Sequence, residues 1–382
     1  MQLRHELVQV CLDGPEEVLS VPKKGDGNPR EQQHACDDVF GEGVFPDDLE
    51  LPDPNDGCGC EEMASQQESP KPPPHIDELE GNGVGAHDPA MAKEGRSYYL
   101  FCTGPGISMR TSKDRLKWSA SSGVFEHALP WTGTTIPGSR EFYWAPDISY
   151  FNHKWHLYYA VSTFGRNRSA IGLATNVTLD PTNPEYHWQD DGPAVQSYAT
   201  DNYNAIDPNL SFDEKGHPWM AFGSFWSGIK ILKIDPATGK PESADGPPLA
   251  IASRARPGAI EAPSIMRHGR DFYLFTSFDI CCRGVNSTYN IRVGRSSSIT
   301  GPYVDRDGKP MMEGGGTLVL ATHGRWHGPG GNSVLRDGRK DLLVYHAYDA
   351  SANGAPKLRI EQINWDKDGW PHVPSANEVP PK

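Results

Sequence analysis

The feature that most constrains the fold of this 382-residue chain is a pattern repeated five times beyond residue 80. Each copy has a short polar turn, usually with proline, then a short strand, a tight turn and a strongly apolar or aromatic strand. The polar turns are His87-Asp88-Pro89-Ala90, Ala145-Pro146-Asp147-Ile148, Ile206-Asp207-Pro208-Asn209, Glu261-Ala262-Pro263-Ser264 and Gly331-Asn332-Ser333-Val334. The apolar strands begin about 53–70 residues apart, a spacing typical of propeller blades with loops.

Most copies continue into a third strand, as at residues 170–174, 228–232 and 291–294. Aromatic and β-branched residues dominate these segments, turn residues separate them, and helical periodicity is nearly absent. The pattern therefore predicts an all-β fold, a five-bladed β-propeller over residues 81–382 with three or four strands in each blade.

Residues 1–80 have a different composition. They hold 20 acidic and 5 basic side chains, ten prolines and only two of the 37 aromatic residues. The remaining chain, with 30 acidic and 31 basic side chains, is close to neutral. We therefore expect residues 1–80 to form a mostly disordered, acidic and proline-rich leader with no catalytic role.

Composition also excludes several functions. No apolar run of about 18 residues exists, so we expect no membrane span, and the near-neutral repeat region argues against binding to nucleic acid. The first residues, interrupted by Arg4 and Glu6, lack the apolar stretch of a signal peptide. We expect a monomer.

The seven cysteines leave their pairing open, and their odd number excludes complete pairing within one chain. Cys281 and Cys282 are adjacent, which allows a vicinal disulfide or two buried thiols. Cys58-Gly59-Cys60 lacks the spacing usual for a zinc site.

The repeats bring acidic residues together. In a propeller the first strand of each blade lies nearest the axis, so Asp88, Asp207 and Glu261 converge on one end of the channel; Asp147 falls two residues later than Asp88 in its repeat. Each aspartate before a proline can by itself be a turn cap. Three acids at matching points of a ring repel one another, however, which favours a functional role. Paired carboxylates across a pocket are the catalytic groups of glycoside hydrolysis.

At these residues the chain resembles glycoside hydrolase family 43, specifically its arabinanase branch. The similar segments include His87-Asp88-Pro89, Tyr143-Trp144-Ala145-Pro146-Asp147, Asn204-Ala205-Ile206-Asp207-Pro208-Asn209, Gly223-Ser224-Phe225-Trp226, Ala259-Ile260-Glu261-Ala262-Pro263-Ser264, Phe278-Asp279-Ile280-Cys281-Cys282-Arg283-Gly284 and Tyr345-His346-Ala347-Tyr348-Asp349. They run in order through nearly the whole repeat region, whereas the first 80 residues match nothing.

The resemblance implies hydrolysis of α-1,5-linked L-arabinofuranose in arabinan or arabino-oligosaccharides, with inversion and with no cofactor for the chemistry. On matching positions, Asp88 is the general base, Glu261 the general acid and Asp207 the carboxylate that tunes Glu261. Inversion implies that the base and acid carboxyl groups lie about 6.5–9.5 Å apart. Further sugar contacts are implied at Asn204, Asn209, Ser224, Trp226 and Phe164.

The chain departs from the family at one point. Related arabinanases hold a calcium or other ion near the channel centre through a histidine, and Gly331 stands in its place here. His327 or His346 could substitute, water alone could hold the ion, or the ion could be absent. No metal ligand is assigned.

Three functions stay open at this point. The leading one is an endo-acting arabinanase; the others are an exo-acting α-L-arabinofuranosidase or β-xylosidase, and a non-catalytic carbohydrate-binding propeller. A polymeric substrate implies an extracellular enzyme, for which four glycosylation sequons, at Asn167, Asn176, Asn209 and Asn286, are suggestive. The missing signal peptide conflicts with that expectation.

Overall fold

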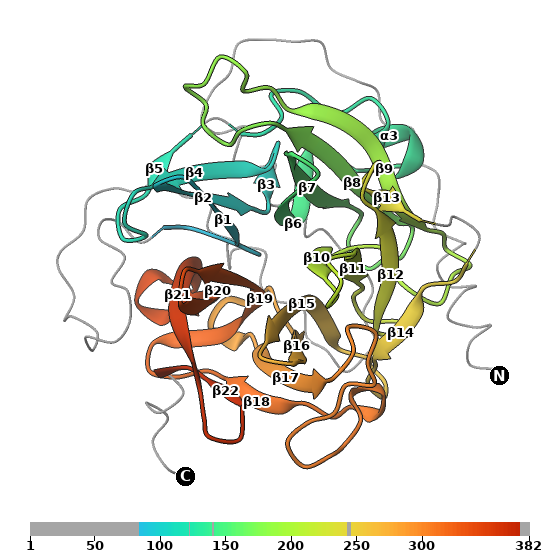
Figure 1. The fold of residues 1–382 in the computed structure, drawn as a ribbon, viewed down its shortest axis with the longest axis vertical. Helices are drawn as coiled ribbons and strands as arrows, with labels where there is room; N and C mark the ends of the chain where they lie inside the picture. Colours follow the sequence, from blue (N-terminus) through green and yellow to red (C-terminus); the bar gives the residue numbers. More distant parts are fainter. Residues whose placement is uncertain (1–83, 122, 140, 243–245, 375–382) are drawn as a thin grey trace.

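The computed structural model describes residues 84–121, 123–139, 141–242 and 246–374, and these residues form five antiparallel sheets around one axis (Figure 1). Blade 1 contains β1 (Ala90–Glu94), β2 (Ser97–Cys102), β4 (Ser108–Ser112) and β5 (Ser119–Ala120). Blade 2 contains β3 (Gly104–Pro105), β6 (Phe142–Phe151), β7 (Lys154–Val161), β8 (Ser169–Asn176) and β9 (Gln189–Ser197). The predicted leader and its cysteines lie outside the described residues.

The other three blades follow the same order. Blade 3 contains β10 (Asn209–Phe212), β11 (Pro218–Phe222), β12 (Ile229–Asp235), β13 (Lys240–Pro241) and β14 (Leu249–Ala252). Blade 4 contains β15 (Ile260–His268), β16 (Asp271–Phe278), β17 (Asn290–Ser296) and β18 (Thr317–Leu320). Blade 5 contains β19 (Trp326–Asp337), β20 (Lys340–Asp349), β21 (Ala355–Trp365) and β22 (Pro371–His372).

Helices are few in the described part of the chain. They are α3 (Thr132–Thr135), η1 (Gly284–Asn286), η2 (Met311–Glu313) and η3 (Ala350–Ala352), and none is long and apolar enough to cross a bilayer. The predicted five-bladed propeller is thus confirmed. Blades 2 and 3 each have five strands, one more than the repeat pattern indicated.

The core is divided into five clusters, and each lies between two neighbouring blades. In β2, for example, Tyr99 and Phe101 pack against blade 2, whereas Tyr98 and Leu100 pack against blade 5. Successive side chains of a strand point to opposite faces, so a strand that is apolar on both faces can fill two of these clusters. This explains why the second strand of each repeat reads as a continuous apolar run.

The five first strands, β1, β6, β10, β15 and β19, contact one another in order and surround the axis (Figure 1). Polar side chains at one matching position in blades 2 to 5, Asp147, Asn209, Ser264 and Ser333, link them. The backbone N–H of Leu210 donates to Asp147 Oδ2 (2.9 Å), and that of Ile265 donates to Asn209 Oδ1 (2.8 Å). The N–H of Val334 donates to Ser264 Oγ (3.1 Å). These bonds join blades 2 to 3, 3 to 4 and 4 to 5, and Ser333 Oγ donates to the carbonyl of Pro89 (2.7 Å) to join blades 5 and 1.

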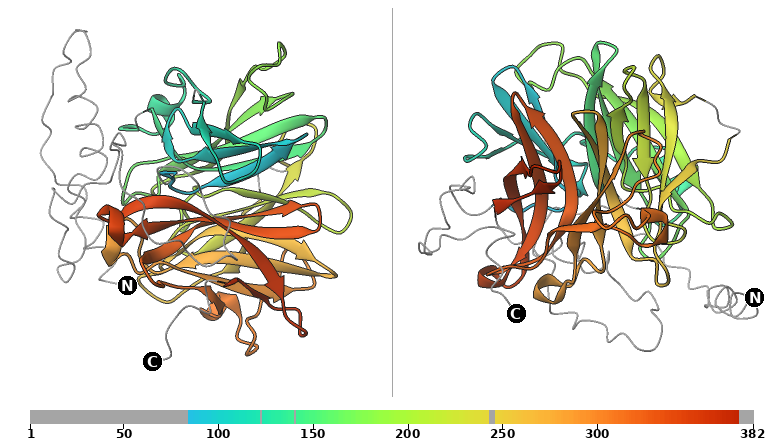
Figure 2. Two further views of the ribbon diagram at one scale, coloured as in Figure 1. Left: turned by 90° about the vertical axis from the view of Figure 1, so that its left-hand side faces the viewer. Right: turned by 60° about the horizontal axis from the view of Figure 1, so that its bottom comes forward.

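The start of the described chain closes the ring. Leu358 N–H donates to the carbonyl of Val84 (2.8 Å), and Gly85 pairs with Lys357 in β21. Blade 1 consequently lies directly beside blade 5, as both views in Figure 2 show.

Candidate active site

A backbone bend recurs at one point near the start of each first strand. Its residue has a positive φ in all five blades: Asp88 (47°), Ala145 (33°), Asp207 (55°), Ala262 (49°) and Gly331 (55°). Positive φ is uncommon for residues other than glycine and concentrates at functional sites, because the surrounding structure must stabilise it. The bends place the three predicted catalytic carboxylates at one end of the channel, Asp88 and Asp207 on bends and Glu261 one residue before one.

Asp88 is surrounded by donors. Its Oδ2 accepts hydrogen bonds from His87 Nδ1 (2.9 Å) and Thr103 Oγ1 (2.7 Å). Thr103 in turn accepts from the N–H of Ala145 (2.8 Å), which ties the carboxylate to blade 2. Burial by itself would raise the pKa of Asp88, but the charge and hydrogen bond of His87, with help from His346 and Thr103, hold that pKa well below its usual range. Asp88 is therefore ionised at any pH near neutrality.

Glu261 and Asp207 have the opposite character. Burial, followed by the charge of Asp88, raises the pKa of Glu261 to about 7, although Ser224 Oγ donates to its Oε2 (2.6 Å). Burial and the charges of Glu261 and Asp88 raise the pKa of Asp207 well above its ordinary value. The charge of Asp88 reaches both of these carboxyl groups, so the structure does bring the three together, with the pKa of Asp88 lowered and those of Glu261 and Asp207 raised.

The five predicted sugar contacts fall into two groups. Trp226 and Phe164 are 42% and 39% exposed and lie in the loops that follow the second strands of blades 3 and 2. The other three are buried: Ser224 donates to Glu261, Asn204 Oδ1 accepts from Ser169 Oγ (2.6 Å), and Asn209 uses both ends of its amide between blades. The aromatic pair is thus accessible, whereas the polar trio is already engaged within the protein.

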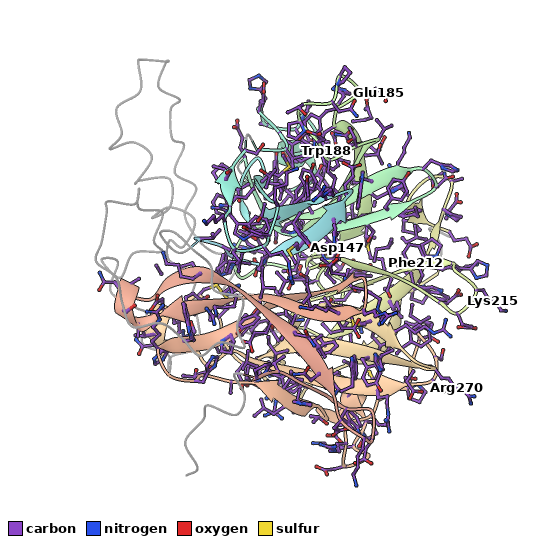
Figure 3. The ribbon with its side chains drawn as sticks, turned by 60° about the vertical axis from the view of Figure 1, so that its left-hand side comes forward. Asp147, Glu185, Trp188, Phe212, Lys215 and Arg270 are labelled. Carbon is purple, nitrogen blue, oxygen red and sulfur yellow. A yellow bond between two sulfur atoms is a disulfide. The ribbon has the colours of Figure 1, made fainter. Side chains whose placement is uncertain are left out.

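Asp147, the fourth carboxylate noted in the repeats, lies inside the molecule, whereas Lys215 and Arg270 project from its edge (Figure 3). It accepts from Asn209 Nδ2 (3.0 Å) and Leu210 N–H, and burial raises its pKa to about 6. Asp147 therefore belongs to the hydrogen bonds that link blades 2 and 3.

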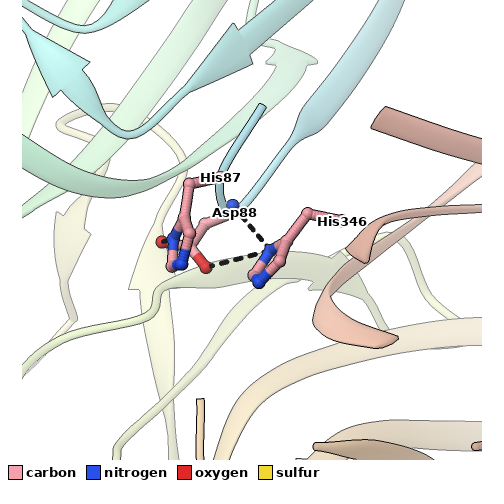
Figure 4. A group of neighbouring side chains, drawn as sticks. All are labelled: His87, Asp88 and His346. Carbon is pink, nitrogen blue, oxygen red and sulfur yellow. Dashed lines mark hydrogen bonds and ion pairs between the residues drawn. The ribbon is translucent and has the colours of Figure 1, made fainter. Parts of the chain in front are cut away.

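His87, Asp88 and His346 form a compact cluster (Figure 4). One ligand atom from each lies within 4.8 Å of the others, a group that could in principle hold a metal ion. Calcium, however, takes about six to eight oxygen ligands, and two of these three atoms are imidazole nitrogens. His327 lies elsewhere on β19, opposite Tyr348.

The hydrogen bonding of His346 also argues against coordination of a metal ion by this ring. Asp88 N–H donates to His346 Nδ1 (3.1 Å), so the proton of the neutral ring is on Nε2, which then has no lone pair to offer. Burial, followed by the charge of His87, lowers the pKa of His346 well below its usual value and keeps it neutral. A Cβ added at Gly331 would come within 2.7 Å of His346 and closer still to Asp88 Oδ1, so no side chain fits at this position without a shift of its neighbours. The residues here do not fit the implied calcium ion.

Sequence reasoning did not assign roles to His87, Thr103 or Tyr348. His87 precedes Asp88 directly in the His87-Asp88-Pro89 segment, and that adjacency was the available signal. Thr103 and Tyr348 lie at the ends of second strands. The β1–β2 hairpin brings Thr103 to Asp88, and the junction of blades 1 and 5 brings Tyr348 to His87.

Cys281 and Cys282 form a disulfide, the first of the two alternatives, in the loop between β16 and η1. Cys102 is a buried free thiol within the described residues.

Comparisons with known proteins agree with this geometry. The model of glycosyl hydrolases family 43 matches residues 83–371. The chain is 47% identical over 290 residues to the extracellular endo-α-(1→5)-L-arabinanase 1 of Bacillus subtilis, covering 75% of this chain and 86% of the relative. It is 43% identical over 300 residues to the extracellular exo-α-(1→5)-L-arabinofuranosidase ArbA of Cellvibrio japonicus, covering 76% and 86%. A Cellvibrio cellulosa α-L-arabinanase solved with arabinohexaose superimposes with a TM-score of 0.74 at 42% identity, covering 76% of this chain and 96% of that one.

Proposed function

The chain belongs to glycosyl hydrolases family 43, and from this premise we propose that it hydrolyses the α-1,5-L-arabinofuranosyl bonds of arabinan, with inversion and within the polymer. One observation carries the proposal: three carboxyl groups share one end of the channel, and their surroundings lower the pKa of Asp88 and raise that of Glu261, which favours an ionised base beside a protonated acid. Inverting hydrolysis needs this pair of states, one base and one acid.

The reaction follows from these states. Asp88 removes a proton from a water molecule, which attacks the anomeric carbon while Glu261 gives its proton to the departing glycosidic oxygen. Asp207 is the third carboxylate of the site, with its own pKa raised by burial and by the charge of Glu261. It fixes the next bend, since its Oδ2 accepts from Ala262 N–H (3.0 Å). Opposite faces of the sugar ring are used, so the configuration inverts and the two carboxyl groups must leave room for water.

The accessible aromatic side chains support binding of a sugar chain. Trp226 and Phe164 offer flat apolar faces of the kind on which sugar rings pack. Ser224 orients Glu261, whereas the side chains of Asn204 and Asn209 are used in hydrogen bonds within the protein.

Product analysis on linear arabinan tests the proposal. We expect a ladder of oligosaccharides, as from an endo-acting enzyme. Arabinose alone would indicate exo action, which the name of the Cellvibrio japonicus relative makes the second candidate. Binding without any product would indicate the non-catalytic alternative, and activity only on xylosides the β-xylosidase.

The acid assignment has its own test. Glu261→Gln should lower kcat on arabinan by about 10²–10⁴-fold, the usual contribution of a general acid. Glu313→Gln makes the same chemical change at an exposed position in η2 and should leave kcat unchanged. Near-normal activity of Glu261→Gln would sink the assignment.

We further propose that the reaction proceeds without a metal, since the side chains at the axis do not fit calcium. Dialysis against EDTA should leave the rate and the melting temperature unchanged. Restoration of either by one equivalent of Ca²⁺ would contradict this.

The Bacillus subtilis and Cellvibrio japonicus relatives are named as extracellular proteins, and the same location is proposed here. Detection of the protein in culture medium of its source organism is the check.

A further inference from the structure

The loop Asp279–Tyr289, between β16 and β17, carries the Cys281–Cys282 disulfide to the channel end. Both cysteines are partly buried, and Cys282 makes two contacts with the groups behind Asp88. Its N–H donates to the hydroxyl of Tyr348 (2.8 Å), and its Sγ lies 3.7 Å from His87 Nε2. The disulfide thus reaches the histidine that binds the proposed base.

His87 is held from several sides. Its Nδ1 donates to Asp88 Oδ2 (2.9 Å), its Nε2 lies 3.2 Å from the hydroxyl of Tyr348, and its ring stacks on His346 with centroids 4.0 Å apart. Cys282 Sγ lies beside Nε2 of the same ring. A histidine held this closely has one orientation, and that orientation fixes the Asp88 carboxylate.

The charges around His87 indicate what it supplies. The titratable groups that face it are Asp88, Glu261, His346 and Tyr348, and the disulfide-bonded Cys282, which does not titrate, lies beside them. His346 is neutral because its Nδ1 accepts the N–H of Asp88. His87 is therefore the cation in this group. It lies beside Asp88, the proposed base, which shares the site with two other carboxyl groups.

We propose that His87 is a positioning residue that orients Asp88 and supplies its counter-charge, and that the Cys281–Cys282 disulfide, with Tyr348, holds His87 in place. The proper geometry of the base then depends on a closed disulfide. This inference rests on the proposed function and deepens it, because Asp88 is the base of that reaction.

Reduction by a dithiol such as dithiothreitol opens this link. A reductant thiolate attacks one cysteine sulfur, which breaks the Cys281–Cys282 bond, forms a mixed disulfide and releases the other cysteine as a thiolate. The second thiolate of the reductant then attacks the reductant's own sulfur in the mixed disulfide and releases the remaining cysteine. Both cysteine thiolates take up protons. Two electrons pass to the protein, which leaves two cysteine thiols and the cyclic oxidised reductant. The bond that constrains the loop at Cys282 is then gone, and the contacts of Cys282 with Tyr348 and His87 loosen.

The test is the dependence of kcat/KM for linear arabinan on pH in the variants His87→Gln, Tyr348→Phe and Cys281→Ser/Cys282→Ser. Loss of the His87 cation stabilises the protonated forms of both Asp88 and Glu261, so both limbs of the profile should move to higher pH. At pH 5 the rate of His87→Gln should fall about tenfold or more, with KM within about twofold. We expect smaller shifts of both limbs of the pH profile, in the same direction, for Tyr348→Phe, for the double serine variant and for the reduced parent enzyme.

Two controls complete the design. Cys102→Ser removes a buried thiol away from the loop and should keep the parent profile. Dithiothreitol should not change the double serine variant. Melting temperatures of all variants identify those that fold poorly, and Tyr348→Phe, which loses only a hydroxyl, tests the proposal should His87→Gln unfold.

The outcomes separate the two proposals. A parent enzyme without activity on arabinan overturns the proposed function itself. An active parent whose profile is unmoved by His87→Gln overturns the role of His87. Unchanged limbs in both the double serine variant and the reduced parent overturn the role of the disulfide.

Discussion

Asp88 and Glu261 carry the same chemical group, and their neighbours alone give them different protonation states. Asp88 receives hydrogen bonds from His87 and Thr103, whereas Glu261 is buried beside other acids with Ser224 as its donor. Stabilisation of the charged form lowers a carboxyl pKa, and burial or a like charge raises it. The division of labour between base and acid is therefore a property of the side chains that surround them.

The pH dependence of activity follows from this difference. Glu261 must be protonated to act, and its pKa is raised to about 7, so kcat/KM should decline as the pH rises through about 7. Asp88 stays ionised well below its ordinary range, so activity should persist at acidic pH until that carboxylate is protonated. Initial rates on arabinan from roughly pH 3 to roughly pH 9 measure both limbs. A rate that kept rising above about pH 8 would contradict the role of Glu261.

At Gly331 the backbone conformation and the neighbouring side chains leave no room for a Cβ atom. Its φ is 55°, and a Cβ there would overlap Asp88 Oδ1 and approach His346 to 2.7 Å. Gly331→Ala should lower the free energy of unfolding by about 2–4 kcal/mol, from backbone strain plus overlap, and should reduce kcat because Asp88 must move.

Gly95 provides a matched control for that prediction. It has nearly the same φ (57°) in the turn between β1 and β2, and a Cβ there would meet no atom within 4 Å. Gly95→Ala should cost only the backbone strain of about 1–2 kcal/mol and leave kcat unchanged. Equal losses of activity in both variants would contradict a role for the space beside Asp88.

At the scale of the elements, the first strands are joined through side chains that follow the bends. Asn209 shows how two functions compete for one residue. The resemblance implies a sugar contact, whereas the structure gives its amide to Asp147 and to the N–H of Ile265. A buried N–H left without a partner costs free energy, so the residue has a reason to be there without any ligand.

Asn209→Ala distinguishes these two roles. We expect the free energy of unfolding to fall by about 2–3 kcal/mol, because two buried partners lose their hydrogen bonds, while KM for arabinan stays within about twofold. Asn364→Ala, which removes an exposed bond to Gln362, should change stability by less than about 0.5 kcal/mol. A large rise in KM with unchanged stability would favour the sugar contact.

At the scale of the whole molecule, stability depends on closing the ring. The closure uses Val84 to Ala86 against β21, just before the residues of the site. The family match, residues 83–371, includes this closing segment.

Two truncations test this closure. A chain lacking residues 1–81 should keep the melting temperature and the activity of the full chain, since no recognised motif precedes this point. A chain lacking residues 1–86 loses the pairing with β21 and should melt roughly 5 °C lower or more. Equal melting temperatures of the two truncated chains would show that the closure adds nothing.

The sequence by itself determined the propeller architecture and the convergence of three acidic residues near its axis. Five repeats of turn, strand and apolar strand predict five blades, because strand periodicity and turn residues are local properties of the chain. The same repeats placed Asp88, Asp207 and Glu261 near one axis, since equivalent positions of a ring must converge.

The tertiary structure alone decided how those acids are used. Ser224, His346 and Tyr348 are far from their partners in sequence, and packing between blades gives Glu261 its donor and burial and brings His346 and Tyr348 beside His87 and Asp88. A pKa depends on charges and donors within a few ångströms, and such neighbours are set by packing between blades. The exclusion of calcium chemistry from His346 likewise depends on one hydrogen bond, from Asp88 N–H, across the junction of blades 1 and 5.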